Sequence, residues 1–311
     1  MPIRCSSVQG TGADAAMTSK GTDTPDRLIT AVDERLPALV DVIRGARRHI
    51  TLSLFRCNDD QVLEELAAAT ARGVVVDVLV TSRAKGGKKK IEKLWRALEK
   101  TGATVRAYTD PVVKYHPKYL IADDGPAIVA SLNFTKKCFR KTCDALVVTY
   151  DPAVVDGLRR LWTADCACEA MPEDLTDRLI IGPERARRQF TALIEQARTS
   201  IRLIDPKLSD PDLVSVLNAK RAAGLTVEVF SAKRLGALKS HGKIMLIDDR
   251  IAVVGSLALA ALSLDFRREV AIVVSEPSAV AETVDLFAAL RAVSPPHHET
   301  PREAGELPCR S

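Results

Sequence analysis

The sequence predicts an α/β fold made of two pseudo-symmetric halves, each a mixed β-sheet flanked by helices. Three observations lead to this prediction. Short runs of β-branched residues alternate with amphipathic helical patterns, which is typical of α/β proteins. A set of segments occurs twice along the 311 residues. The chain is 46% hydrophobic and 27% charged, a balance that excludes disorder of the whole chain and suits a globular protein.

The internal repeat has two parts. Residues 26–29 (DRLI) recur at 177–180, and residues 46–52 (ARRHITL) resemble 197–203 (ARTSIRL), both 151 positions later. Residues 116–124 (HPKYLIADD) resemble 241–249 (HGKIMLIDD), now 125 positions later. The second copy is thus shorter by 26 residues, because it lacks the lysine-rich region and helix-like segment of residues 85–102. Two copies indicate a duplication, since a solenoid needs about three repeats or more.

Each copy is expected to fold in the same order, with a helix, a strand, a second helix, a buried strand and then three strands around a histidine. Gly73 and Gly224 are suitable C-terminal stops for the second helix of each copy. In the first copy, helices are predicted over 36–48 and 61–71 and strands over 50–55, 74–80, 119–122, 127–130 and 145–150. In the second copy, helices are predicted over 188–199 and 212–222 and strands over 201–205, 225–231, 244–247, 251–254 and 270–274.

The repeat also sets the expected domain boundaries. The first half is predicted to cover residues 25–168 and the second half residues 176–292, joined by a linker over 169–175. Residues 1–24 and 293–311 are predicted to be disordered tails. His297 and His298 fall in the second tail, and we interpret them as solvated residues rather than ligands.

Neither the N-terminus nor the rest of the chain carries an obvious membrane-targeting segment. The first 26 residues lack the apolar core of a signal peptide. The longest apolar stretch, residues 251–264, has 14 residues, whereas a transmembrane helix needs about 20. We therefore expect a cytoplasmic protein that is at most peripheral to a membrane.

The seven cysteines are scattered and odd in number, which does not suit a disulfide framework. Cys138, Cys143, Cys166 and Cys168 are candidates for a four-thiolate metal site, but their spacings match no common zinc pattern. Reduced thiols are the favoured interpretation, because cysteine is often simply buried.

A constellation of polar residues recurs at identical spacing in both copies. Counted from the histidine, position +2 is lysine, +7 aspartate, +15 serine and +28 a carboxylate. The first copy supplies His116, Lys118, Asp123, Ser131 and Asp144, and the second copy His241, Lys243, Asp248, Ser256 and Glu269. Position +17 is Asn133 in the first copy and Ala258 in the second. Positions 0 and +2 of a strand share one face, so each histidine should lie beside its lysine.

These residue types suit attack on a phosphodiester. Lysine, serine and asparagine side chains can neutralise the non-bridging oxygens in the transition state. One imidazole can attack phosphorus, and a second can protonate the departing oxygen and later activate water. A carboxylate on the far ring nitrogen would fix the tautomer. Asp123 and Asp248 have an alternative interpretation as turn residues, a normal role for aspartate.

The doubled H-x-K-x4-D pattern resembles the signature of the phospholipase D superfamily, and residues 130–135 (ASLNFT) and 255–270 resemble its downstream segments. The resemblance covers residues 26–292 and implies two phospholipase D-like repeats with one active site at their seam. It also implies a phosphohistidine intermediate, with His116 as nucleophile, His241 as general acid, and Asp144 and Glu269 orienting the histidines. No metal or other cofactor is expected.

Three positions depart from the family pattern. Ala130 replaces the usual glycine. Asp144 stands where glutamate is commoner, which implies a shorter reach to His116. Ala258 replaces an asparagine and removes one amide donor, a loss of about 2–4 kcal/mol in related anion sites.

The sequence favours phospholipid as the substrate and keeps nucleic acid as the alternative. Aromatic residues are only 4% of the chain, so stacking platforms for single-stranded nucleic acid are scarce. The basic stretch over residues 83–90 (RAKGGKKK) could attract an anionic membrane surface or a polynucleotide. A solvated loop is an equal interpretation of that stretch. A non-catalytic phosphate-binding module is the third hypothesis, suggested by Ala258.

Overall fold

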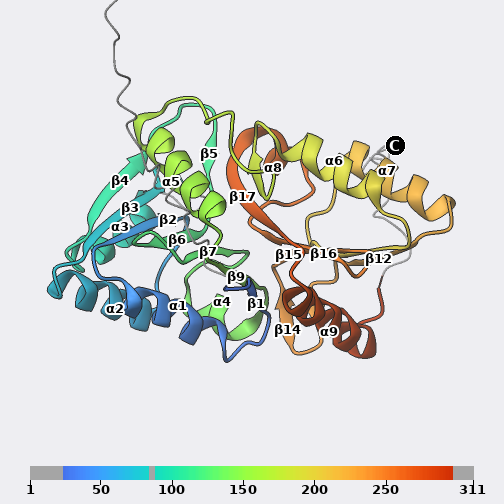
Figure 1. Ribbon diagram of the computed structural model, residues 1–311, viewed down its shortest axis with the longest axis horizontal. Coiled ribbons are helices and arrows are strands. Elements are labelled where there is room, and N and C mark those ends of the chain that lie inside the picture. The colour runs from blue at the N-terminus through green and yellow to red at the C-terminus, as the bar shows by residue number, and fades with distance from the viewer. Residues whose placement is uncertain (1–23, 84–87, 297–311) are drawn as a thin grey trace, which may run out of the picture.

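The computed structural model describes residues 24–83 and 88–296 and contains two large mixed sheets side by side (Figure 1). The first half contains β1 (Arg27–Ile29), α1 (Arg35–Gly45), β2 (His49–Leu54), α2 (Asp60–Ala71), β3 (Val75–Thr81), α3 (Lys88–Glu99), β4 (Thr104–Tyr108), β5 (Lys114–Tyr115), β6 (Tyr119–Ala122), β7 (Ala127–Ala130), α4 (Lys136–Lys141), β8 (Thr142–Cys143), β9 (Leu146–Thr149) and α5 (Pro152–Ala167). The second half contains β10 (Leu179–Gly182), α6 (Ala186–Gln196), β11 (Ser200–Ile204), α7 (Pro211–Ala222), β12 (Thr226–Phe230), β13 (Arg234–Leu235), β14 (Leu238–Ser240), β15 (Lys243–Ile247), β16 (Ile251–Gly255), α8 (Ala261–Phe266), β17 (Arg267–Val274) and α9 (Pro277–Val293).

The two sheets have the same strand order, which confirms the α/β class and matches the predicted duplication. The order is β1-β9-β7-β6-β2-β3-β4 in the first sheet and β10-β17-β16-β15-β11-β12 in the second. Along these two strand orders, the pairs β2–β3, β3–β4 and β11–β12 are parallel and the other described pairs are antiparallel. The extra edge strand β4, with α3, is the segment that the second copy lacks.

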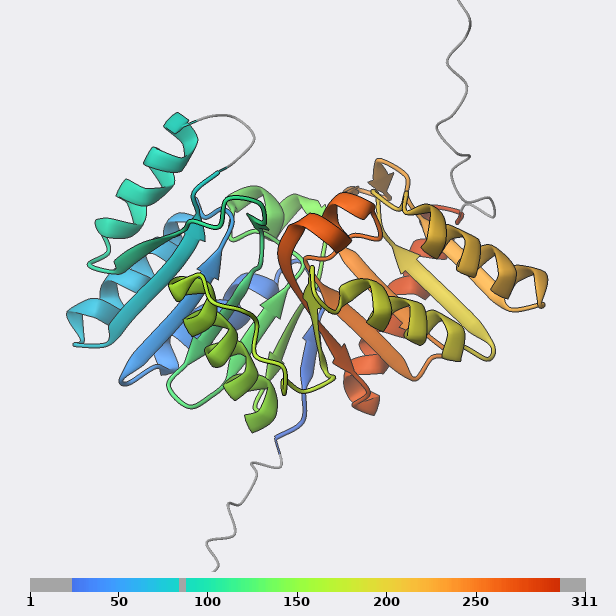
Figure 2. The ribbon, with the colours of Figure 1, turned by 90° about the horizontal axis from the view of Figure 1, so that it is seen from above.

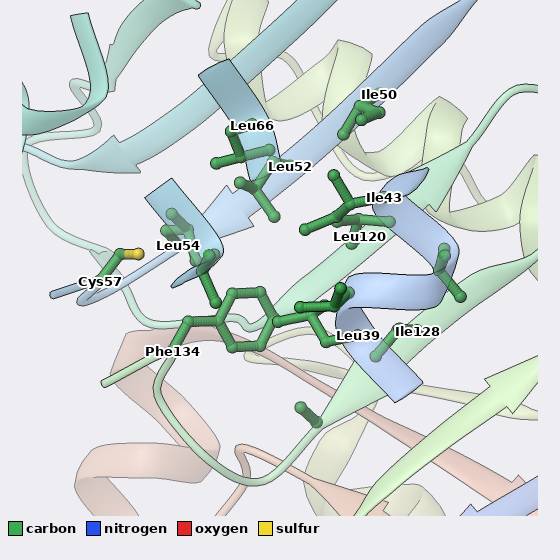
Figure 3. Packing of buried hydrophobic residues seen from close by; sticks show 14 of the residues in the cluster. Leu39, Ile43, Ile50, Leu52, Leu54, Cys57, Leu66, Leu120, Ile128 and Phe134 are labelled. Atoms are coloured by element: carbon green, nitrogen blue, oxygen red, sulfur yellow. The ribbon is translucent and has the colours of Figure 1, made fainter. Parts of the chain in front are cut away.

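Helices and strands form where the periodicity of the apolar side chains and the capping residues indicate the same boundaries. Asp59 caps α2 by accepting the Val62 amide hydrogen, and Asp210 caps α7 in the same way through Leu213. Figure 3 shows the core that results: leucines and isoleucines of α1, α2, β2, β6 and β7 pack around Phe134. Gly73 and Gly224 follow α2 and α7 with φ of 86° and 92°, as the predicted helix stops require.

An apolar core lies between the two halves, in addition to the core within each half. A single buried cluster joins Tyr119 and Val147 of the first sheet to Val254 and Ile272 of the second, with α5 and α9 packed against it. The chain therefore folds as one body around a central seam, and Figure 1 shows the sheets meeting there.

Two short strands cross the seam. β5 pairs with the start of β17, so that Lys114 lies opposite Arg267 and Tyr115 opposite Arg268. β8 pairs with β14, with Cys143 opposite Ser240. Each crossing strand ends one residue before a histidine or a carboxylate of the repeated constellation, so these pairings position His116 and Asp144 at the seam.

Some expectations about the ends and loops need correction. Helix α9 continues through Val293, so the second half extends beyond residue 292. Lys88–Lys90 form the first turn of α3 rather than a loop. Residues 84–87, the N-terminal segment up to residue 23, and the C-terminal segment with His297 and His298 lie outside the described residues. In the ranges 24–83 and 88–296, we find no helix that is both long and apolar enough to span a bilayer.

Candidate active site

The crossing strands bring the two histidines to the seam. The His116 amide donates to the Arg268 carbonyl at 2.9 Å, and the Gly242 amide donates to the Cys143 carbonyl at 2.8 Å. Gly242 is required there, because a Cβ would lie 2.7 Å from the Cys143 carbonyl oxygen. Each histidine segment is thus fixed to the segment of the other half that carries a carboxylate.

The carboxylates pair with histidines across the seam rather than within their own repeat. His241 Nδ1 lies 3.0 Å from both carboxylate oxygens of Asp144. His116 Nδ1 contacts Glu269 Oε1. The sequence-based expectation that Asp144 reaches His116 is therefore wrong. The β8–β14 pairing brings Asp144 to His241, and the β5–β17 pairing brings Glu269 to His116. Sequence spacing within one copy cannot reveal this exchange.

Buried hydroxyl groups hold the two carboxylates. Ser131 Oγ donates to Asp144 at 2.7 Å and Thr142 Oγ1 donates at 2.6 Å. Ser263, a residue that the sequence analysis did not single out, donates to Glu269. Ser131 is fully buried behind Asp144, so its expected role in binding substrate phosphate is not supported.

Ser256, Asn133 and Ala258 complete the downstream segments. Ser256 is buried and exchanges hydrogen bonds with the Val270 backbone at 3.1 and 3.3 Å, so it too is a structural residue rather than a phosphate ligand. Asn133 keeps a buried Oδ1 that has no hydrogen-bond partner among the described residues. The Ala258 amide donates to Ser263 Oγ at 2.9 Å. The two halves therefore differ at position +17, as the sequence indicated.

Both motif lysines lie beside their histidines. Lys118 and Lys243 are buried, and each donates to the carbonyl of its own histidine, at 2.6 and 2.7 Å. Lys118 Nζ also lies 3.0 Å from His116 Nδ1. The Phe55 ring packs against His116 with centroids 4.3 Å apart. Lys118 thus lies beside the ring of His116, and Lys243 is bonded to the backbone of His241.

The surroundings of His116 disfavour its protonated form. Burial lowers the pKa of His116 well below 6.5, and Lys118, Lys243, Arg267 and Lys207 lower it further. This imidazole is therefore neutral at pH 7.

The two carboxylates also differ. Burial raises the pKa of Glu269, although neighbouring cations and Ser263 oppose it. Burial also acts on Asp144, but His241, Thr142 and Ser131 outweigh it and lower the pKa of that carboxyl group. Asp144 is thus a stable anion beside His241.

Two further cations lie near the site, Arg267 and Lys207, and neither was predicted from the sequence. Arg267 Nη1 lies 3.8 Å from Glu269 Oε1. Lys207 follows β11, and partial burial of its ammonium group together with Lys243 and Arg267 lowers its pKa. The repeat contained a signal for Lys207, since it lies 151 positions after Arg56, another basic residue that follows a strand. The site thus gathers more positive charge than the motif alone suggests.

Asp123 and Asp248 lie at the far ends of β6 and β15, so their expected place in the catalytic set is wrong. From Lys118 to Asp123 the chain advances about 16 Å along an extended strand. The Asp123 carboxylate accepts the amide hydrogens of Arg47, Arg48 and His49 at 2.7–2.8 Å. Asp248 does the same in the second half. Both have positive φ, 46° and 52°, which is the turn role that the sequence left open.

We expect Asp123→Asn to lower the free energy of unfolding by about 1–2 kcal/mol, because backbone donors lose a charged acceptor. Burial opposes the low pKa of Asp123, but the backbone amides of His49, Arg47 and Arg48 outweigh it. The stabilisation is therefore present above pH 4 and is lost as the pH falls through the folded-state pKa. Denaturant unfolding of both proteins at several pH values tests this. A large loss of turnover per folded molecule would contradict the turn role.

The described cysteines form no disulfide with one another. Cys57, Cys138 and Cys143 are buried, Cys166 is half-buried and Cys168 is exposed. The four-thiolate cluster is not seen in the described ranges, where the candidate metal ligands that gather are Cys138, Asp144 and His241.

Comparisons with known proteins agree with this geometry. The family model described as "Cardiolipin synthase, PLD-like domain" matches residues 39–165. Cardiolipin synthase A of Pseudomonas aeruginosa is 29% identical over 138 residues, which are 43% of this chain and 28% of that protein. The matched part thus spans less than a third of that curated relative.

Solved structures show the same fold over most of the chain. Phosphatidylserine synthase of Haemophilus influenzae has a TM-score of 0.63 at 10% identity and covers 86% of each chain. Polyphosphate kinase of Porphyromonas gingivalis has a TM-score of 0.67 at 19% identity and covers 85% of this chain and 50% of that one. The family model over residues 39–165, the shared fold and the doubled histidine–lysine motif at the seam together support membership of the phospholipase D superfamily.

Proposed function

We propose that this protein is a phosphodiesterase of phospholipase D type that transfers the phosphatidyl group of a phospholipid to water or an alcohol through a phosphohistidine intermediate. The observation that carries the proposal is the pair of histidines at the seam, each with its own lysine and with a carboxylate from the other half. The different surroundings of the two imidazoles suit them to different roles in the reaction.

In the first step the neutral His116 attacks phosphorus, because burial and nearby cations keep its ring deprotonated. Lys118 and Lys243 neutralise the phosphoryl oxygens as the transition state develops. His241, held by Asp144, gives its proton to the departing alcohol oxygen. The products of this step are the free alcohol and a phosphorus–nitrogen bond to His116.

In the second step the neutral His241 takes a proton from water or an acceptor alcohol. The resulting oxygen nucleophile attacks phosphorus and breaks the bond to His116. Asp144 stabilises the imidazolium that forms. Hydrolysis and transfer thus use the same residues and differ only in the incoming oxygen.

The choice of phospholipid rests on the two helices that precede the carboxylates. α8 leads directly into the strand that carries Glu269, and its Leu262 and Phe266 are 46% and 49% exposed one helical turn apart. α4 precedes Asp144 at the equivalent place and carries Lys137, Arg140 and Lys141 on its exposed surface. Figure 2 shows α4 in green and α8 in orange on the same face of the molecule, at the upper edge of the view. Apolar side chains and cations on one face of the molecule suit the surface of an anionic bilayer.

The experiment compares lipid and nucleic acid substrates in the presence of a chelator. Vesicles of phosphatidylglycerol, cardiolipin or phosphatidylcholine are expected to release headgroup, and added ethanol should give phosphatidylethanol. The exposed cations of α4 and α3 would also suit a polynucleotide. Cleavage of DNA or RNA without turnover of any lipid would therefore replace the phospholipid assignment by a nuclease.

We expect the double variant Leu262→Ser/Phe266→Ser to lose about tenfold or more of its activity on vesicles, because partial burial of each side chain in lipid contributes about 1 kcal/mol. Activity on a monomeric short-chain phospholipid should change little. Val75→Ser is the matched control, since Val75 is exposed at the start of β3, away from the seam. Equal losses on vesicles and on the monomeric lipid would show that α8 does not act by docking to a membrane.

A further inference from the structure

Three potential metal ligands converge beside His241. The sulfur of Cys138, a carboxylate oxygen of Asp144 and a ring nitrogen of His241 all lie within 4.8 Å of one another. Cys138 is 6% exposed and Asp144 is fully buried, whereas His241 is partly exposed. An ion could therefore reach this cluster from the side on which His241 is open. We propose that Cys138, Asp144 and His241 form a zinc site that inhibits the enzyme.

The donor atoms suit zinc. A thiolate, an imidazole and a carboxylate are the ligand types that proteins use for Zn²⁺, at about 2.0–2.3 Å from the ion. Tetrahedral bonds of that length separate ligand atoms by about 3.3–3.8 Å. The cluster needs only a shift of about 1 Å to reach this geometry. Three protein ligands leave the fourth position for water.

Neighbouring groups already hold two of the ligands in place. Thr135 accepts the Cys138 amide hydrogen at 3.2 Å, which fixes the thiol at the start of α4. Ser131 and Thr142 hold Asp144 by hydrogen bonds of 2.7 and 2.6 Å. Outer hydrogen bonds of this kind orient the ligands of known metal sites.

The thiol is a departure from the symmetry of the repeat. The residue 125 positions after Cys138 is Ser263. Its hydroxyl donates to Glu269, the carboxylate that contacts His116. A serine therefore fits this position of the fold and supports the carboxylate without offering a soft ligand. Among the described residues, the full ligand set therefore gathers around His241, with Cys138 and Asp144 supplied by the other half.

Binding of zinc would change the chemistry of His241. The Cys138 thiol loses its proton to solvent, and the ion bonds to the sulfur, to Asp144 and to the imidazole. A metal-bound imidazole can no longer serve as the imidazolium that protonates the leaving oxygen. Inhibition, unlike binding, rests on the proposed function, so the two are measured separately.

Binding is measured first, without substrate, by titrating the full chain with Co²⁺ as a spectroscopic substitute and with Zn²⁺ in competition. We expect one cobalt ion per chain with a thiolate-to-cobalt charge-transfer band that zinc abolishes. Cys138→Ser should lose the band, and His241→Asn should weaken binding by about tenfold or more. Cys168→Ser, which removes an exposed thiol at the end of α5, should leave the titration unchanged. Thermal unfolding of each variant checks that it is folded.

Inhibition is then measured as the ratio of turnover with and without zinc, each variant being compared with its own zinc-free rate. The wild type should be inhibited about tenfold or more under saturating zinc, and Cys138→Ser less than about twofold. A cobalt band that persists in folded Cys138→Ser, or no stoichiometric binding to the wild type, would overturn the zinc site. Absent phosphodiesterase activity with an intact cobalt titration would instead count against the proposed function alone.

Discussion

Replacement of His116 by alanine is expected to lower phosphodiester turnover by at least about 10⁴-fold, because the covalent route loses its nucleophile. The neutral state of His116 supports this role: burial and four cations lower its pKa well below 6.5. Lys118 and Lys243 remain in the variant, so substrate should still bind. The loss should therefore be in kcat rather than in KM.

His49→Ala is the matched control for this variant. His49 is an exposed histidine at the start of β2 and lies beside Asp77, outside the seam. Its removal should change the turnover less than about twofold. If His116→Ala and His49→Ala had the same small effect, the nucleophile would have to be sought elsewhere.

Replacement of Asp144 by asparagine is expected to slow turnover by about 10³-fold or more, because His241 loses the anion that sets its tautomer and stabilises its protonated form. Each carboxylate pairs with the histidine of the other half, so the two carboxylates are expected to affect different histidines. Asp144 acts on His241, the proposed acid, at 3.0 Å, and Glu269 acts on His116, the proposed nucleophile. Variants of the two carboxylates should therefore fail in different steps.

A substrate with a good leaving group separates these steps. A nitrophenyl phosphodiester needs little protonation of its departing oxygen, so its first turnover should be nearly normal in Asp144→Asn. Glu269→Gln should slow that first turnover, because attack by His116 is itself impaired. The measurement is the burst of nitrophenolate, up to one per enzyme, in rapid mixing. The opposite pattern would show that each carboxylate serves the histidine of its own repeat.

The sequence predicted the positions of the strands around each histidine well, because the same local pattern occurs in both copies of the repeat. The strands predicted at 119–122 and 127–130 coincide with β6 and β7. Their β-branched and apolar residues are buried on both faces, so local pattern and tertiary packing agree. The expected place of the site at the seam came from the resemblance to the phospholipase D superfamily, which implies one active site between two halves.

The partners of the carboxylates could not be predicted, because they depend on long-range strand pairing. The β8–β14 and β5–β17 pairs join segments about 100 to 150 residues apart, and spacing within a copy carries no information about them. The same applies to Arg267 and Lys207, which reach the site from the other side of the seam. Asp123 was wrongly placed in the catalytic set for a different reason. It recurs in the repeat at the same position relative to the histidine, but it recurs because both halves contain the same turn.

Trapping of the covalent intermediate tests the central claim, that His116 attacks a phosphorus atom on which His241 also acts. A phospholipid labelled at phosphorus is mixed with enzyme and quenched in alkali, because phosphohistidine is unstable in acid. The label should reach the peptide that contains His116, accumulate toward one per chain in His241→Ala with an activated leaving group, and be absent from His116→Ala. A labelled His116→Ala protein, or an unlabelled His241→Ala protein that has released its leaving group, would contradict this account.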